Sequence, residues 1–287
     1  MAKSRDVYRR MKSVDNTKKI TRTMEMVSTA KLRQAQRRVI EARPYSAQLN
    51  DVIGRLATPA LAELAPLLRQ PDRIETAAVV LLTSNRGLCG AFNANLIRTA
   101  TKLLADLEEQ GTQTEFHVYG NKGISYFRFR GIEMDLQRND LPDRAGTEDA
   151  KSVIDDLARR FVEGQLDAAY VVFAEFRNMV STPPAVRQVL PVAVEEKSGS
   201  QPFYILDPSA EEILSQLVPL YITNSTFSAM LETAAAEHAA RRTAMKSATD
   251  NAEEFLNNLR RTYNRARQAE ITNQIAEIIG GADALDG

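Results

Sequence analysis

The feature that most constrains this chain is the absence of helix breakers near its two ends. The first 43 residues contain neither glycine nor proline, and neither occurs between Leu220 and Ile279. In a helix interior, each glycine costs about 1 kcal/mol and each proline about 3 kcal/mol. Two long helix-permissive segments are therefore separated by a sequence of a different kind. This arrangement predicts a rod that is built from both termini, with a compact domain inserted between them.

The C-terminal segment carries a seam with coiled-coil spacing. The seam positions alternate steps of three and four residues, and twelve of the sixteen are apolar. Such a repeat is typical of helices that pair along their length. We expect the polar members Asn224, His238 and Arg241 to fix the register or to face outward. The full seam is Leu217, Leu220, Asn224, Phe227, Leu231, Ala234, His238, Arg241, Met245, Ala248, Ala252, Phe255, Leu259, Thr262, Ala266 and Ala269.

The N-terminal segment has a weaker seam and a strongly basic polar face. Residues 1–43 hold 13 Lys or Arg against 4 Asp or Glu, whereas residues 211–287 hold 7 against 11. Opposite charges favour pairing of the two segments, and an antiparallel coiled coil is the simplest way to bury both seams. Pro44 is compatible with a kink or a helix restart. The expected N-terminal seam is Val7, Met11, Val14, Ile20, Met24, Val27, Ala30, Ala35, Tyr45, Leu49, Val52 and Leu56.

The sequence between the two segments has the pattern of an α/β domain. Two continuous apolar runs, Ala77–Thr83 and Asp167–Arg177, predict buried strands. The other expected elements are helices at Asn93–Glu109 and Thr147–Glu163, a strand at Thr114–Tyr119, and weaker edge strands at Val186–Val192 and Phe203–Leu206. The predicted fold class is therefore α/β (α+β), a long antiparallel coiled coil with an inserted Rossmann-like domain. We place the N-terminal helix at 1–58, the α/β domain at 75–206 and the C-terminal helix at 209–287. An ordinary bundle of amphipathic helices is the alternative.

Residues that could carry catalysis are scarce and scattered. His117 and His238 are the only histidines, and Cys89 is the only cysteine. None of them has metal-ligand spacing to another such residue. The loop that holds Gly87 and Gly90 does not match a phosphate-binding motif, which indicates a tight turn with a structural Arg86. We therefore expect no catalytic, cofactor-binding or metal-binding residue, and no cofactor.

The sequence indicates neither a secretory signal peptide nor a transmembrane segment. The N-terminus lacks the apolar stretch of a secretory signal peptide. No window approaches 18 apolar residues, so no transmembrane segment is expected.

Three stretches resemble the gamma subunit of F-type ATP synthases, the rotor of the central stalk. They are Val14–Gln36 (VDNTKKITRTMEMVSTAKLRQAQ), Thr83–Asn95 (TSNRGLCGAFNAN) and Ala244–Gly281. The similarity runs in matching order from about residue 3 to 285. It implies a non-catalytic shaft that couples ion flow through a proton-driven membrane c-ring to ATP synthesis or hydrolysis in a hexamer of alpha and beta subunits.

The resemblance also implies partners, a location and contact residues. The α/β domain is expected near the epsilon subunit and the c-ring, and the chain is expected to be peripheral on the cytoplasmic face of the inner (plasma) membrane. Where the family usually has Asp in SDRGLCG, this chain has Asn85, which places any ion pair there in question. By the same resemblance, the residues of rotor–stator contact or coupling are Met24, Arg86, Arg267, Gln268 and Thr272.

A nucleic-acid-binding coiled coil is the main alternative, because the basic N-terminal segment could neutralise phosphates. It requires aromatic or Gly-rich readout elements near the basic run. Within residues 1–51, the aromatic residues are Tyr8 and Tyr45 alone. A purely structural scaffold is a further alternative.

Overall fold

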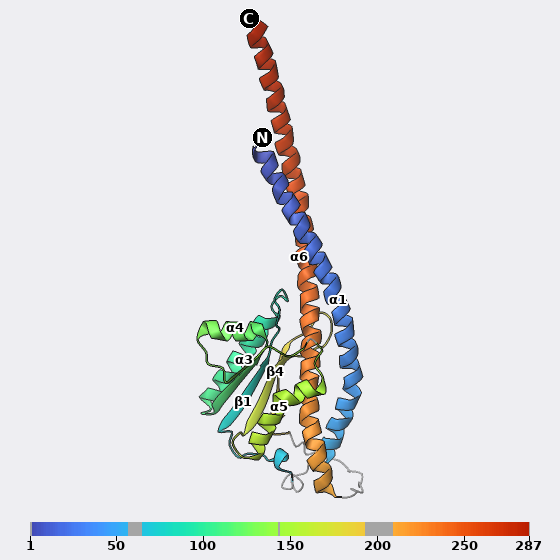
Figure 1. The fold of residues 1–287 in the computed structure, drawn as a ribbon, viewed down its shortest axis with the longest axis vertical. Helices are drawn as coiled ribbons and strands as arrows, with labels where there is room; N and C mark the ends of the chain where they lie inside the picture. The colour runs from blue at the N-terminus through green and yellow to red at the C-terminus, as the bar shows by residue number, and fades with distance from the viewer. Residues whose placement is uncertain (1, 57–64, 143, 193–208, 287) are drawn as a thin grey trace. The chain divides into compact units, whose positions relative to one another are not determined.

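The computed structural model describes residues 2–56, 65–142, 144–192 and 209–286 (Figure 1). This part of the chain divides into two compact units. One unit joins residues 1–28 to residues 242–287, and the other contains residues 29–241. Helices α1 (Ala2–Leu56) and α6 (Ala210–Asp286) contribute to both units. The long terminal helices and the α/β sheet between them confirm the predicted fold class.

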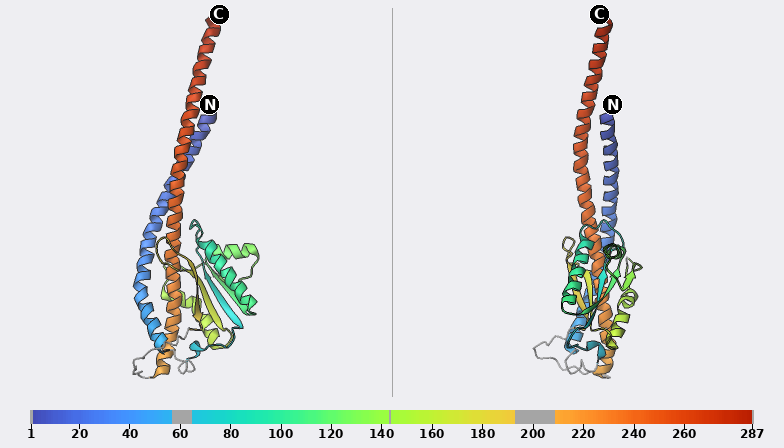
Figure 2. Two further views of the ribbon diagram at one scale, coloured as in Figure 1. Left: turned by 180° about the vertical axis from the view of Figure 1, so that it is seen from behind. Right: turned by 90° about the vertical axis from the view of Figure 1, so that its left-hand side faces the viewer.

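The first unit is an antiparallel pair of helices. Thr249 Oγ1 donates a hydrogen bond of 2.8 Å to Thr21 Oγ1. Towards the beginning of α1, Ser4 Oγ donates to Glu270 Oε2 over 2.6 Å, so α6 runs in the opposite direction. The two helices lie side by side in both views of Figure 2. Lys18 and Glu253 form an ion pair at 3.1 Å, as the opposite charges of the two segments predict.

The buried seam of α6 differs in phase from the predicted one. Within residues 242–279, the most buried side chains are Met245, Thr249, Ala252 and Leu256. Their spacing is four, three, four, whereas the prediction used three, four, three. Phe255 is 53% exposed, so its assignment to the seam was wrong. The buried residues are those on the side of α6 that faces α1. Where two adjacent residues such as Phe255 and Leu256 are both apolar, the sequence of α6 alone does not show which of them lies on that side.

The seam of α1 needs a similar correction. Ile20, Val27, Tyr45 and Val52 are exposed, and Ala30 is exposed as well. The buried side chains of α1 are Thr21, Ser28, Leu32, Val39, Leu49 and Ile53. The distances between these positions are sums of three-residue and four-residue steps, as in a coiled-coil seam. Two of the positions, however, carry the polar residues Thr21 and Ser28. The assignment of the five exposed residues to the seam was therefore wrong, whereas the predicted seam residue Leu49 is buried.

The second unit is built around a five-stranded sheet in the order β3-β2-β1-β4-β5. Strands β1, β2, β3 and β4 are parallel, and β5 pairs with β4 in antiparallel fashion. The bounds are β1 Thr76–Leu82, α3 Phe92–Glu109, β2 Gln113–Tyr119, α4 Asn121–Arg130, β3 Leu136–Arg138, α5 Thr147–Val162, β4 Ala168–Ala174 and β5 Pro184–Leu190, with a 3-10 turn at Pro66–Leu68.

Helices cover both faces of this sheet. Ala77, Val79 and Leu81 of β1 pack with α3 and α4. Val80 and Leu82 pack with α5, α6 and the end of α1. Because β1 is buried on both sides, it needs an almost continuous apolar sequence. This requirement explains why β1 and β4 were readily predicted.

Two elements and one strand bound depart from the prediction. Helix α4 and strand β3 were not predicted, because α4 is rich in Arg and Phe and β3 has only three residues. The predicted edge strand at Val186–Val192 is β5, displaced by two residues and antiparallel at the edge of the sheet. The predicted strand Phe203–Leu206 lies outside the described residues.

Candidate functional site

The loop between β1 and α3 is held in shape by its own side chains. Asn93, at the start of α3, accepts a hydrogen bond from Ser84 N at 3.1 Å, and its Nδ2 donates to Ser84 Oγ at 2.8 Å. Ser84 Oγ donates to Arg86 O at 2.7 Å. Cys89 is buried beneath this network and lies 3.1 Å from Asn93 Nδ2. The loop is thus internally braced.

The tip of the same loop presents two side chains to solvent. Leu88 is 62% exposed and has a φ of 63°, a left-handed conformation that is unfavourable for a residue with a branched side chain. Arg86 is exposed as well. Its carbonyl has a structural role, whereas its guanidinium has no hydrogen bond or ion pair within the described part of the chain. The braced loop therefore presents a cationic and an apolar side chain at its tip, beside a backbone conformation of a kind that often occurs at functional sites.

Arg241 of α6 attaches this loop to the long helix. Its Nε donates to Gly87 O at 3.3 Å, and its Nη2 donates to Arg86 O at 3.2 Å. The same Nη2 lies 2.7 Å from Glu237 Oε1, and only 9% of the Arg241 side chain is exposed. The buried guanidinium is therefore balanced by one carboxylate and two carbonyl oxygens. The sequence placed Arg241 in the seam of the coiled coil but did not reveal this contact with the loop.

Residue 85 explains how the loop tolerates Asn where the related motif has Asp. Asn85 Nδ2 donates to Asn139 O at 3.2 Å, and Asn85 Oδ1 accepts from Asn121 N at 3.0 Å. Asn139 Nδ2 donates in turn to Asn121 Oδ1 at 2.9 Å. An aspartate could accept the second of these bonds but could not donate the first. The amide thus joins the β1–α3 loop to the ends of β2 and β3.

Helix α6 fills the crevice in which α/β folds of this kind commonly bind ligands. In an open parallel sheet, that crevice lies at the carboxyl ends of the strands, where the connections change from one face to the other. Here the change occurs between β1 and β4. Thr233 Oγ1 accepts a hydrogen bond from Ala174 N at 3.4 Å, and Glu232 Oε2 accepts one from Phe176 N at 3.2 Å. Thr233 and Glu232 of α6 therefore bind backbone N–H groups at the end of β4, where a ligand would bind in related folds.

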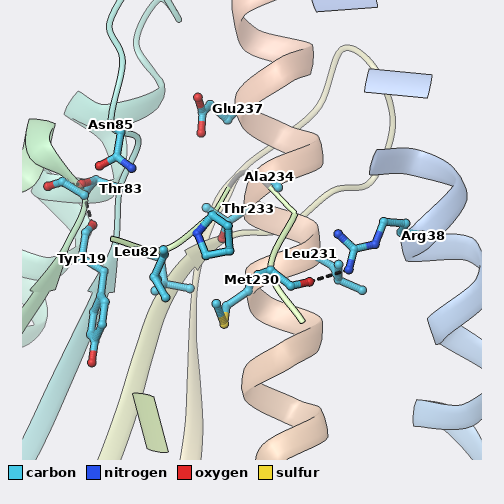
Figure 3. A pocket seen from close by; sticks show the side chains of 14 residues that line it. Arg38, Leu82, Thr83, Asn85, Tyr119, Met230, Leu231, Thr233, Ala234 and Glu237 are labelled. Carbon is cyan, nitrogen blue, oxygen red and sulfur yellow. Dashed lines mark hydrogen bonds between the residues drawn. The ribbon is translucent and has the colours of Figure 1, made fainter. Parts of the chain in front are cut away.

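A small cavity lies beside this contact. Its volume is about 80 Å³, and it is lined by the ends of β1 and β2, the β3–α5 loop, α6 and α1. Figure 3 shows Leu82, Thr83 and Tyr119 on the sheet side and Thr233 and Glu237 on α6. A nucleotide is too large for such a volume.

Titratable groups in the sheet do not form a reactive centre. Burial lowers the pKa of His117, and this effect outweighs the attraction of Glu115 and Asp135. A hydrogen bond from Arg160 holds the pKa of Glu115 below its usual value. These groups form a partly buried ion pair beside a neutral histidine, which is a structural arrangement.

The predicted contact residues occupy different parts of the structure. Arg267, Gln268 and Thr272 are exposed on α6, and Met24 is partly buried on α1. The Thr21–Thr249 contact places Met24 near the middle of the helical pair, whereas Arg267 lies 18 residues further along α6, about 27 Å away. Arg86 belongs to the other unit. Within the first unit, the structure therefore brings Arg267, Gln268 and Thr272 together and separates them from Met24.

The described residues lack two further kinds of feature. None of their helices combines the length and apolar content of a membrane span. The same residues contain no group of three or more His, Cys, Asp or Glu side chains placed to hold a metal ion.

Comparison with known proteins decides the family. Residues 3–285 match the family model described as ATP synthase. The chain is 50% identical to the ATP synthase gamma chain of Gemmatimonas aurantiaca, with 100% of each chain covered. The chain belongs to the ATP synthase gamma chain family. It is also 41% identical to the gamma chain of Chlorobium phaeobacteroides, again with full coverage of both chains. This membership confirms the resemblance and replaces the nucleic-acid-binding alternative.

Solved structures agree with the fold of this gamma chain family member. One is the OSCP/F1/c-ring part of the Euglena gracilis mitochondrial ATP synthase, with a TM-score of 0.67, 20% identity, and coverage of 99% of this chain and 95% of that chain. Another is the central stalk/c-ring of the Tetrahymena thermophila enzyme, with a TM-score of 0.61, 20% identity, and coverage of 80% and 99%. At this identity, the likeness establishes the shared fold.

Proposed function

We propose that this chain is the rotating central shaft of a proton-driven F-type ATP synthase. It transmits rotation of a membrane c-ring to the catalytic hexamer of alpha and beta subunits, and it transmits rotation in the opposite direction when ATP is hydrolysed. The observation that carries this proposal is the gamma chain match over residues 3–285. The proposal keeps the domain assignment 1–58, 75–206 and 209–287, with two shaft helices and one inserted domain.

The helical pair has the properties that a shaft needs. Ser4 of α1 contacts Glu270, and every described side chain from Ile271 to Ile279 is exposed, so α6 extends beyond α1 as a single helix. Ile271, Ile275 and Ile278 are among these exposed residues. A single helix has a different surface on each side, so three equivalent catalytic sites around it would each contact a different surface. Coupling requires such differential contact.

The chain itself has a non-catalytic role in this proposal. Its sheet has the topology of a nucleotide-binding fold, but α6 occupies the crevice through Thr233 and Glu232. Catalysis therefore belongs to the alpha and beta subunits. The purified chain alone should hydrolyse no ATP, and turnover by protein free of those subunits would contradict the proposal.

Contacts with the hexamer are assigned to three places. The exposed polar residues Arg267, Gln268 and Thr272 form one contact near the end of the helical pair, and Met24 forms a second contact about 27 Å away. Arg86 forms the third contact from the braced loop. The α/β domain is assigned to the epsilon subunit and the c-ring, which places the chain peripherally at the cytoplasmic face of the membrane.

A double substitution tests the assignment on α6. Arg267→Ala with Gln268→Ala should lower coupled ATP synthesis of the reassembled complex about tenfold, because the change removes polar contacts at the rotating interface. Both residues are exposed, so the free energy of unfolding should change by less than about 1 kcal/mol. The matched control is Arg261→Ala with Thr262→Ala, an exposed pair six residues earlier, which should retain synthesis. Equal losses in both double variants would contradict the assignment.

A further inference from the structure

A basic cavity lies between α1, α6 and the loop that joins β3 to α5. Its volume is about 250 Å³. Lys31 and Arg38 of α1 line it from one side, and Arg144 of the loop lines it from another. Ala35 of α1, Leu231 and Ala234 of α6 and the buried His238 also line it. The cavity therefore combines apolar lining with cationic groups from two separate elements.

The two guanidinium groups at this cavity bind uncharged acceptors. Arg38 Nη2 donates to the carbonyl oxygen of Ala145, and Arg144 Nη2 donates to Gln34 Oε1 at 2.8 Å. Within the described part of the chain, neither Arg38 nor Arg144 has an acidic partner. Each guanidinium has five N–H donors, so both retain donors for a ligand.

Three acidic residues, on α6, after β3 and on α5, have hydrogen-bond or ion-pair partners outside the cavity lining. Glu237 pairs with Arg241 at 2.7 Å, and Asp140 pairs with Arg138 at 2.7 Å. Asp149 Oδ2 accepts a hydrogen bond of 2.6 Å from Gly146 N at the start of α5. None of the described residues that line the cavity is a carboxylate, whereas Lys31, Arg38 and Arg144 of its lining are cationic.

We propose that this cavity binds a phosphate-class oxyanion. A tetrahedral anion with two negative charges matches the fork geometry of guanidinium groups, which bind phosphate in a bidentate manner. The bound phosphate group belongs either to free phosphate or pyrophosphate, or to a nucleotide. The cavity is large enough to hold a whole phosphate or pyrophosphate ion. Arg38 projects from α1 towards α6, as Figure 3 shows, so a bound anion would connect α1 to the β3–α5 loop through Arg38 and Arg144.

Calorimetric titration of the full chain tests this site. Phosphate, pyrophosphate and ADP are titrated in turn at constant ionic strength, with chloride as the reference anion. The variants are Arg144→Gln and Arg38→Gln. The matched control is Arg33→Gln, an exposed position on α1 that does not line the cavity. Arg144 is exposed, so its substitution leaves the fold intact, and thermal unfolding verifies this for each variant.

We expect saturable binding of pyrophosphate or phosphate that Arg144→Gln and Arg38→Gln each weaken by at least about tenfold, while Arg33→Gln leaves it unchanged. Tighter binding of ADP than of pyrophosphate, with the same dependence on Arg144, identifies a nucleotide as the source. The proposal is overturned if no saturable heat appears, if chloride gives the same response, or if Arg33→Gln weakens binding as much as Arg144→Gln. Because the titration uses the chain alone, its outcome is independent of the rotary function.

Discussion

At the scale of single residues, Arg241 connects the long helix to the β1–α3 loop of the α/β domain. Arg241→Ala would remove a cation that contacts Glu237 and the side-chain donor to two loop carbonyls. Removing one partner of a buried ion pair costs about 3–5 kcal/mol. We therefore expect a loss of that order in the free energy of unfolding, measured by urea denaturation.

The matched control for Arg241 is Arg177→Ala. Arg177 also pairs with a carboxylate, Glu175, but its side chain is 62% exposed. Exposed pairs contribute at most about 1 kcal/mol. Equal losses in the two variants would show that Arg241 does not hold the loop.

His117 gives the chain a predictable dependence on pH. Burial lowers the pKa of His117 in the folded state, so the unfolded state binds more protons once the pH falls below the ordinary histidine value of about 6.5. Stability due to the neutral imidazole is therefore present above that pH and is lost as the pH falls below it. The free energy of unfolding should therefore be lower at pH 5.5 than at pH 7.5.

The variant His117→Gln should reduce that dependence in urea unfolding measured at the two pH values. Its amide can remain uncharged in the same partly polar surroundings. Most carboxylates titrate below this window, so their contribution is small there. An unchanged slope in the variant would mean that another group controls the pH response.

At the scale of secondary-structure elements, the phase of the α6 seam provides the sharpest test. Leu256 is 4% exposed, and the neighbouring Phe255 is 53% exposed. Leu256→Ala should cost about 2–4 kcal/mol, because it leaves a cavity between the paired helices. Phe255→Ala should cost less than about 1 kcal/mol although it removes the larger side chain. Thermal unfolding of the two variants measures the difference. A larger loss of stability in Phe255→Ala than in Leu256→Ala would show that Phe255 belongs to the buried seam, as the sequence pattern predicted.

The same comparison shows which parts of the fold were accessible to sequence reasoning. Strand β1 was predictable because burial on both faces requires an unbroken apolar run. Asn224 was expected to fix the register, and its Nδ2 does donate to Ser46 Oγ of α1 at 2.9 Å. The phase near Leu256 was not predictable, because it depends on the surface of α1 and not on α6 alone.

The features of the candidate site also differed in how far the sequence could predict them. The motif around Arg86 was recognised by its resemblance to the family sequence SDRGLCG, and the structure locates that residue at an exposed loop tip. The attachment of this loop by Arg241 depends on a contact between residues more than 150 positions apart. No local pattern encodes such a contact, and helix α4 was missed because its short amphipathic pattern is weak.

At the scale of the whole molecule, the central claim is that this chain rotates as a shaft inside the catalytic hexamer. Val180 lies between β4 and β5 and is 93% exposed, whereas the native Cys89 is buried at 2% exposure. A Val180→Cys variant can therefore carry a single visible marker on the α/β domain without competing reaction at Cys89. The complex with alpha and beta subunits would be fixed to a surface through the beta subunits.

Single-molecule observation of that marker during ATP hydrolysis is the most direct test. The account predicts stepwise rotation in one direction, with a rate that rises with ATP concentration and stops when ATP is removed. ATP hydrolysis at a normal rate by complexes that contain this chain, with the marker stationary, would contradict it.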